Sequence, residues 1–185
     1  MGQEAQVTLQ SGHKLMKVGD YSGALKIYNR IIGDQPRNAE AHYHAGNALI
    51  GMGQKNAETA ITAYQNAITR NQYYASAYFK KGLELSFSFG RNEEALSNVA
   101  KAISIGTGLQ EPLLVQCSIV LSGFVLSRLG RDEEADFSLA LFKKSSESPF
   151  KEKLRKEFVY TEDEHLSEVQ EENLIKLLRM YDYLE

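Results

Sequence analysis

Apolar and polar positions follow helical periodicity along most of the chain, in segments that end at glycine. In the first segment, Leu9, Leu15 and Met16 fall at helical spacing, and Gly19 ends it. Asp20 stands where a helix N-cap accepts hydrogen bonds from the free amides of the next helix. Continued along the chain, this pattern predicts helices over residues 3–18, 21–32, 39–52, 56–70, 73–89, 92–105, 112–129 and 131–142.

One stretch breaks the rhythm. Residues 106–111 read GTGLQE, which is too glycine-rich for a helix, so a loop is expected there. Pro112 suits the first turn of the following helix, because the amide hydrogen that proline lacks would have no partner at that position. That helix is apolar on nearly every side, which predicts burial on more than one face.

Small residues recur with a long period. The first glycines of the four segments are Gly12, Gly46, Gly82 and Gly123, at intervals of 34, 36 and 41 residues. Each is followed by a second glycine and then by an alanine. The second glycines are Gly19, Gly53, Gly90 and Gly130, and the alanines are Ala24, Ala60, Ala95 and Ala135. Such a period is typical of a helical-repeat array. Where two helices of a hairpin approach closely, side chains must be small, so we expect the first glycine and the alanine of each repeat to meet.

This arrangement over residues 5–142 resembles the tetratricopeptide repeat, a helix-turn-helix unit of 34 residues. The resemblance implies an all-α fold, a right-handed helical-hairpin solenoid of four such repeats with C-terminal capping helices. The repeats would span 5–37, 38–72, 73–108 and 112–142, and a charged linker with amphipathic helices would occupy 143–185. The chain departs from the family pattern where a tryptophan is usual, since His42 takes that packing position in the second repeat.

The tail from residue 143 to residue 185 has a different character. Thr161 and Glu164 form a capping box that opens a final helix. The apolar residues of that helix, between Leu166 and Tyr181, fall within one half turn. Because a solenoid needs a terminal cap, we expect this helix to cover the end of the array. Docking into the groove of the array, or against a second chain, are the alternatives.

Composition and charge limit the partners. The chain is 43% apolar and 24% charged, as in ordinary folded proteins, and its net charge is −3. Without a concentrated basic footprint, neither nucleic acid nor an anionic membrane is an expected partner. The single cysteine excludes an intrachain disulfide, and the N-terminus resembles neither a secretory signal nor a membrane span. These features predict a cytoplasmic protein, either a monomer or a homodimer.

No set of residues predicts catalysis, a cofactor or a metal site. His42 and His44 are two residues apart and so point in different directions on a helix. His13 and His165 stand alone in the sequence. Cys117 lies in an apolar helix, where an unreactive thiol is usual. The chain is therefore predicted not to be an enzyme.

The resemblance places a peptide-binding groove on the first helix of each repeat, which lines the concave surface in this family. The inward positions carried onto this chain are Leu9, His13, Met16, Lys17, Tyr43, Asn47, Ile50, Phe79, Leu83, Ser86, Phe87, Val120, Phe124, Ser127 and Arg128. This groove would be mostly apolar and aromatic. For Leu83 and Val120, packing against neighbouring helices is an equal alternative to exposure.

These positions also show whether the chain has the binding residues of one particular subfamily, the co-chaperones. Tetratricopeptide co-chaperones bind the acidic tails of heat-shock chaperones with cationic and asparagine side chains. At the matching positions this chain has Leu9, His13, Asn47, Phe79 and Leu83, so only the asparagine is present. Without the cations, the desolvation of a carboxylate ligand would not be compensated. We therefore do not expect binding of chaperone tails.

The predicted function is that of a non-catalytic protein-protein interaction module, such as an adaptor or scaffold. Its groove would bind an apolar peptide or an amphipathic helix, because these ligands need pockets for spaced apolar side chains. The alternative is a self-assembling structural scaffold that uses its terminal helices for oligomerisation.

Overall fold

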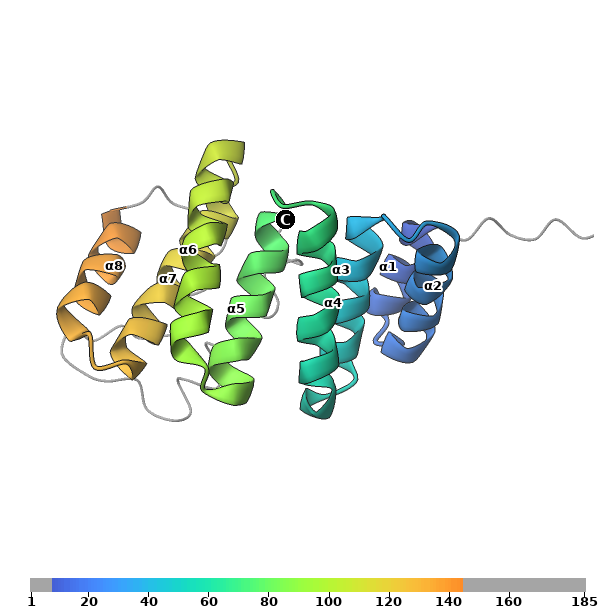
Figure 1. Cartoon of the computed structure of the whole chain (residues 1–185), viewed down its shortest axis with the longest axis horizontal. Coiled ribbons are helices and arrows are strands. Elements are labelled where there is room, and N and C mark those ends of the chain that lie inside the picture. The colour runs from blue at the N-terminus through green and yellow to red at the C-terminus, as the bar shows by residue number, and fades with distance from the viewer. Residues whose placement is uncertain (1–7, 145–185) are drawn as a thin grey trace, which may run out of the picture.

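The computed structural model describes residues 8–144, which are all-helical apart from short turns (Figure 1). The helices are α1 Leu9–Lys17, α2 Tyr21–Asp34, α3 Ala39–Gly51, α4 Ala57–Arg70, α5 Ala75–Phe89, α6 Asn92–Leu109, α7 Pro112–Arg128 and α8 Asp132–Lys144. A short 3-10 helix, η1 Gln54–Asn56, precedes α4 and holds the extra residues of the second turn. The predicted all-α architecture is confirmed.

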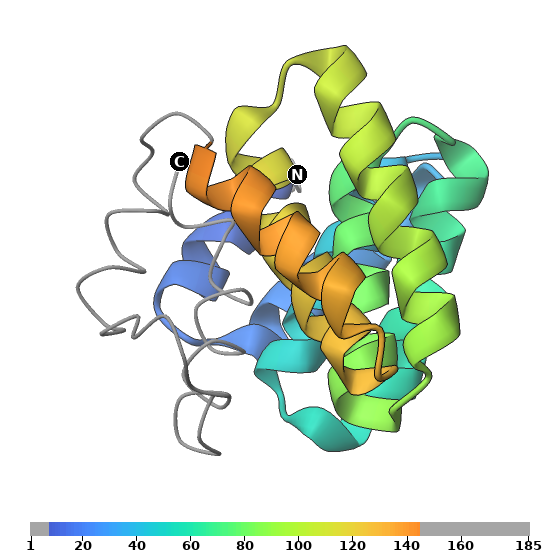
Figure 2. The same cartoon turned by 90° about the vertical axis from the view of Figure 1, so that its left-hand side faces the viewer.

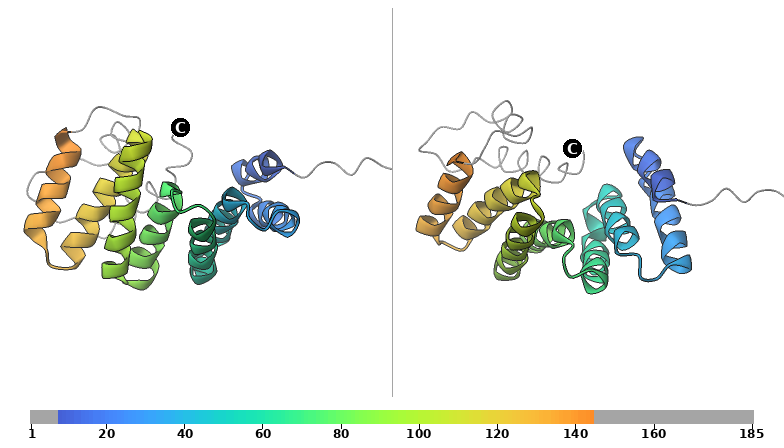
Figure 3. Two further views of the ribbon diagram at one scale, coloured as in Figure 1. Left: turned by 45° about the horizontal axis from the view of Figure 1, so that its top comes forward. Right: turned by 90° about the horizontal axis from the view of Figure 1, so that it is seen from above.

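Helices that follow one another in the chain pack side by side, so the array grows as a row of hairpins. The hairpins are α1 with α2, α3 with α4, α5 with α6, and α7 with α8. Seen from above, they follow a shallow arc with α3, α5 and α7 on its inner side and α4 and α6 on its outer side (Figure 3). Of the α-helices in residues 8–144 that do not follow one another in the chain, only α5 and α7 make substantial contact.

The second glycine of each repeat forms the turn inside its hairpin. Gly19, Gly53, Gly90 and Gly130 have φ values of 78°, 112°, 64° and 70°. Residues with a Cβ rarely adopt such angles, so glycine is required at these turns. After the first turn, the Asp20 carboxylate accepts a 2.8 Å hydrogen bond from the Gly23 amide, as predicted for the N-cap. The spacing of the second glycines therefore sets where each hairpin reverses.

The first glycine of each repeat makes room for a large side chain. A Cβ at Gly46 would lie 2.5 Å from Cε1 of Tyr64, and one at Gly12 would overlap the Tyr28 ring. The sequence predicted that Ala24 and its equivalents would occupy this contact. In the first two hairpins the nearest group is instead the tyrosine four residues after the alanine. In the third and fourth hairpins the alanine does lie at the contact, with its carbonyl oxygen 3.1 Å from a Cβ at Gly82 and 3.4 Å from one at Gly123.

The bounds of the first two helices differ from the sequence prediction. α1 begins at Leu9, because Thr8 is extended and its hydroxyl accepts a hydrogen bond from the Ser11 amide. One continuous helix over residues 3–18 is therefore wrong at Thr8, and residues 3–7 lie outside the described residues. α2 continues through Gly33 to Asp34, two residues beyond its expected end.

The expected loop at residues 106–111 is also wrong. α6 continues through both glycines to Leu109 and ends at Gln110, whose φ of 60° is left-handed. Gly106 is buried against α7, and a Cβ there would lie 3.1 Å from Cγ2 of Val115. Packing against α7 therefore outweighs the low helix propensity of the two glycines.

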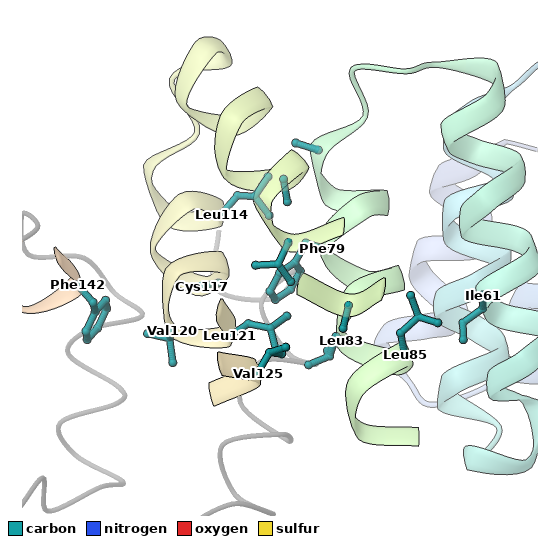
Figure 4. Packing of buried hydrophobic residues seen from close by; sticks show 14 residues of the cluster. Ile61, Phe79, Leu83, Leu85, Leu114, Cys117, Val120, Leu121, Val125 and Phe142 are labelled. Carbon is teal, nitrogen blue, oxygen red and sulfur yellow. The ribbon is translucent and has the colours of Figure 1, made fainter. Parts of the chain in front are cut away.

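The largest apolar cluster lies between α5, α6 and α7 (Figure 4). It includes Phe79 and Leu83 from α5 and Leu114, Cys117 and Leu121 from α7. α7 is buried around most of its circumference, which confirms the prediction from its all-round apolar sequence. Among the helices of residues 8–144, none is both long enough and apolar enough to cross a membrane.

The predicted C-terminal helices lie outside the described residues. Whether the tail caps the array therefore stays a prediction. The described chain ends in α8, and Phe137 and Leu141 of that helix are exposed.

Candidate functional site

The fifteen predicted groove residues divide into two groups by exposure. Five are buried: Tyr43, Phe79, Leu83, Ser86 and Val120. The others are partly or fully exposed: Leu9, His13, Met16, Lys17, Asn47, Ile50, Phe87, Phe124, Ser127 and Arg128. The exposed members lie at the two ends of the predicted surface, on α1 with α3 and on α5 with α7. We call these the N-terminal half and the C-terminal half.

The buried residues are core residues and not anchors for a partner. The Tyr43 ring packs at 5.9 Å from the Tyr64 ring and 5.0 Å from the Tyr74 ring, measured between centroids. Phe79 has no exposed surface and belongs to the core of α5 to α7. Leu83 and Val120 are buried in the same core, which decides between the two alternatives for them.

In the C-terminal half, three predicted residues come together as the Phe–Arg cluster, defined as Phe87, Phe124 and Arg128. The two phenylalanine rings lie 4.7 Å apart between centroids with an interplanar angle of 30°. The Arg128 guanidinium carbon lies 5.0 Å from the Phe87 centroid and 4.8 Å from the Phe124 centroid. Arg128 also donates a 3.0 Å hydrogen bond to the Ser86 carbonyl. One cation thus covers two aromatic faces, an arrangement that fixes all three side chains.

In the N-terminal half, histidines from two hairpins meet. His13 of α1 and His44 of α3 lie 4.3 Å apart between ring centroids, with an interplanar angle of 65°. The Tyr28 ring stacks on His44 at 5.5 Å, and Tyr43 contacts His44 at 5.0 Å. The prediction that His13 stands alone is wrong.

A signal in the sequence could have found this pair. His13 follows Gly12 by one residue and His44 precedes Gly46 by two, so both lie near the first glycine of their repeats. First helices of neighbouring repeats lie in similar positions along the array, and residues near equivalent glycines are therefore close in space. The contact between His13 and His44 was missed because the two residues are far apart in the sequence.

Glu40 completes the cluster. It lies one turn before His44 on α3, and its Oε1 is 3.8 Å from Nε2 of His44. The neighbouring His44 side chain holds the pKa of the Glu40 carboxyl below its ordinary value. The ligand atoms of His13, Glu40 and His44 all lie within 4.8 Å of one another. We call these residues the His–Glu cluster.

His42 and Asn47 serve the packing of the second hairpin. His42 is buried and its Nε2 lies 3.2 Å from the Pro36 carbonyl, which Arg70 also contacts at 2.5 Å. Burial lowers the pKa of His42, because the charged imidazolium would lose its hydration. The Tyr64 hydroxyl donates a 2.9 Å hydrogen bond to Oδ1 of Asn47. His42 therefore fills the packing position assigned to it.

Comparison with known proteins agrees with the architecture. No protein-family profile matches the sequence, and no curated protein does. The structure of MamA superposes with a TM-score of 0.65 at 26% identity, covering 81% of this chain and 79% of that chain. A fragment of MamA from Desulfovibrio magneticus RS-1 gives 0.63 at 20% identity, covering 74% of this chain and 72% of that one. TTC0263, a tetratricopeptide protein of Thermus thermophilus, gives 0.62 at 17% identity, covering 79% and 75%.

These similarities and the hairpin geometry define the class of protein. The fold is that of the tetratricopeptide-repeat proteins, an all-helical solenoid. Its neighbours suggest a protein-interaction scaffold, and proteins of this kind are typically not catalytic.

Proposed function

We propose that this chain is a non-catalytic interaction module that binds an apolar peptide or amphipathic helix on the inner face of its arc. The Phe–Arg cluster is the central contact of that site. The observation that carries this proposal is the position of two partly exposed aromatic rings under one arginine, on the helices α5 and α7 that line the inner side. Aromatic and arginine side chains are enriched among the residues that dominate binding energies.

The fixed geometry of the cluster favours binding. Phe87 and Phe124 are held against each other and against Arg128, so a partner would not have to order them. Binding to side chains that are already ordered avoids an entropy cost of about 0.5–1.5 kcal/mol per immobilised side chain. An apolar side chain of a partner would then pack on the exposed ring edges. The N-terminal half, through Met16 and Ile50, would extend the contact along the arc.

The classes of partner that the sequence excludes are also excluded in this proposal. We propose a protein partner in the cytoplasm, and neither nucleic acid nor a membrane. The acidic tails of heat-shock chaperones are not the ligand, since Phe79 and Leu83 replace the expected cations and are buried. The matching asparagine, Asn47, already accepts a hydrogen bond from Tyr64.

The test of this proposal starts from peptides selected by display against the full chain. The dissociation constant of a selected apolar peptide is then measured by calorimetry for the wild type and for Phe124→Ala. We expect the variant to lose about 2 kcal/mol of binding free energy, as for the dominant residues of other interfaces. Its helical circular dichroism should be unchanged, because Phe124 is only partly buried.

The matched control is Phe137→Ala, which removes the same side chain from α8. Phe137 is 66% exposed and lies on α8, which carries no member of the Phe–Arg cluster. We expect this control to bind as the wild type does. Equal binding by Phe124→Ala and the wild type would show that the site lies elsewhere.

A second candidate function, self-assembly, rests on the end of the array. α8 is the last helix of residues 8–144 and faces the viewer in Figure 2. Its Phe137 and Leu141 are 66% and 44% exposed, and two apolar side chains at the surface of one helix suit contact with another copy.

If the chain assembles through α8, the wild type should change its apparent mass on dilution in light-scattering measurements. The double variant Phe137→Ser, Leu141→Ser should then stay monomeric at all concentrations. A wild type that is monomeric throughout would remove self-assembly as a function.

A further inference from the structure

We propose that the His–Glu cluster of His13, Glu40 and His44 binds a divalent transition-metal ion, with Zn²⁺ as the best match. The cluster lies between α1 and α3, in the N-terminal half of the predicted groove, and shares no residue with the Phe–Arg cluster.

The backbone already places the three ligands together. Glu40 and His44 are four residues apart on α3 and so share one face of the helix. His13 reaches the same place from α1, in a different hairpin. All three ligand atoms lie within 4.8 Å of one another, although their residues come from two helices.

The distances are close to those of a bound ion. In a tetrahedral site with zinc–ligand bonds of about 2.0–2.2 Å, neighbouring ligand atoms are about 3.4 Å apart. Oε1 of Glu40 and Nε2 of His44 are 3.8 Å apart, a small excess over that value. The Glu40 side chain is 52% exposed and can rotate to close the remaining gap. Because Glu40 and His44 lie on one helix, this pair can bind an ion by side-chain adjustment alone.

The ligand types select the metal. Two imidazoles and one carboxylate suit Zn²⁺ and similar transition-metal ions, whereas Ca²⁺ and Mg²⁺ prefer sets made only of oxygen atoms. Three ligands from the described residues leave a fourth position for water. The exposed position of Glu40 gives an ion access from solvent.

The surroundings of His44 orient its ring. Tyr28 stacks on the imidazole with an interplanar angle of 26°, and Tyr43 packs against its edge. An imidazole held in this way loses less conformational freedom when it binds an ion. A simple surface ion pair between Glu40 and His44 would not require the third side chain, His13, from another hairpin.

A metal ion at this place would join the first hairpin to the second. α1 packs chiefly against α2, so its position depends on few contacts with the rest of the array. An ion bound only by the folded chain raises the apparent stability in proportion to the logarithm of its concentration. Zn²⁺ is thus expected to fix α1 against α3.

The experiment uses the full chain without an affinity tag, since a histidine tag would itself bind metal. After treatment with a chelator, the protein is titrated with Zn²⁺ by calorimetry and, separately, with Co²⁺ by visible absorption. We expect one saturable site per chain, the absorption of cobalt bound to nitrogen and oxygen, and a higher melting temperature with Zn²⁺. Mg²⁺ should cause no change.

Two variants and one control assign the site. Glu40→Gln removes an exposed carboxylate, and His13→Gln removes one imidazole. Each should weaken Zn²⁺ binding by at least the roughly 10- to 100-fold that loss of an outer partner costs a metal site. Glu58→Gln, which removes an exposed carboxylate from the first turn of α4, should bind as the wild type does.

The proposal is overturned if the wild type shows no saturable Zn²⁺ binding. It is equally overturned if both cluster variants bind as tightly as the wild type. Glu40→Gln keeps the test valid if His13→Gln fails to fold, because Glu40 lies at the surface at the start of α3.

Discussion

Replacing Gly46 with leucine is expected to lower the free energy of unfolding by about 3 kcal/mol, the upper end of the usual cost of overpacking. Even the Cβ of the new side chain would lie 2.5 Å from the Tyr64 ring. That ring is 1% exposed and its hydroxyl is hydrogen-bonded to Asn47, so it has no space into which to move. Urea denaturation followed by circular dichroism measures the loss.

The control is the same substitution at Gly33, in α2. No atom lies within 4 Å of a Cβ at this position, and the residue is exposed. Leucine has the higher helix propensity, so Gly33→Leu should leave stability unchanged or raise it by up to about 1 kcal/mol. Similar midpoints for the two variants would contradict the assignment of Gly46 to the contact between helices.

Replacing Phe79 with alanine should cost about 3–5 kcal/mol of stability, as for other fully buried aromatic residues. Phe79 has no exposed surface and packs in one cluster with Leu83 and Leu121 (Figure 4). From sequence alone, Phe79 was placed in the groove, where its loss would have affected binding and not folding. The midpoint of urea denaturation distinguishes the two roles.

Phe87→Ala provides the comparison, since it removes the same side chain from the same helix. Phe87 is only partly buried and lies in the Phe–Arg cluster. Its loss should therefore cost much less stability than the loss of Phe79. If the two variants unfolded at the same urea concentration, the distinction between core and surface on α5 would be wrong.

The fold could be predicted from sequence because its main determinants are local. A glycine with positive φ ends the first helix of each hairpin, and helical periodicity marks the segments between these turns. Asp20 caps its helix as predicted, by accepting a hydrogen bond from the amide of Gly23, and Asn38 caps the next helix in the same way through the amide of Ala41. These features depend on a few neighbouring residues and are visible in the sequence.

The candidate site was less predictable because exposure depends on contacts between repeats. Phe124 and Arg128 reach the surface, as a groove position requires, and their role in binding stays a prediction. The same reasoning fails for Tyr43 and Phe79, since neighbouring helices cover both. The contact of His13 with the second hairpin could not be predicted for the same reason, because it depends on how two repeats pack.

The helical extent of α6 shows the same limit. Glycine content predicted a loop at residues 106–111, and the propensity of these residues for helix is low in isolation. In the array, Gly106 allows α6 and α7 to approach closely, which stabilises helix in the place where sequence disfavours it. Tertiary packing therefore determines how far α6 extends.

The most direct test of the proposed function is to map a bound peptide on the chain by nuclear magnetic resonance. The isotope-labelled protein is titrated with an apolar peptide selected by display, and amide shifts are followed residue by residue. The account predicts that the largest shifts cluster around Phe87, Phe124 and Ser127, with smaller ones near Met16 and Ile50. Shifts confined to the outer helices α4 and α6, or to α8, would contradict binding on the inner face of the arc.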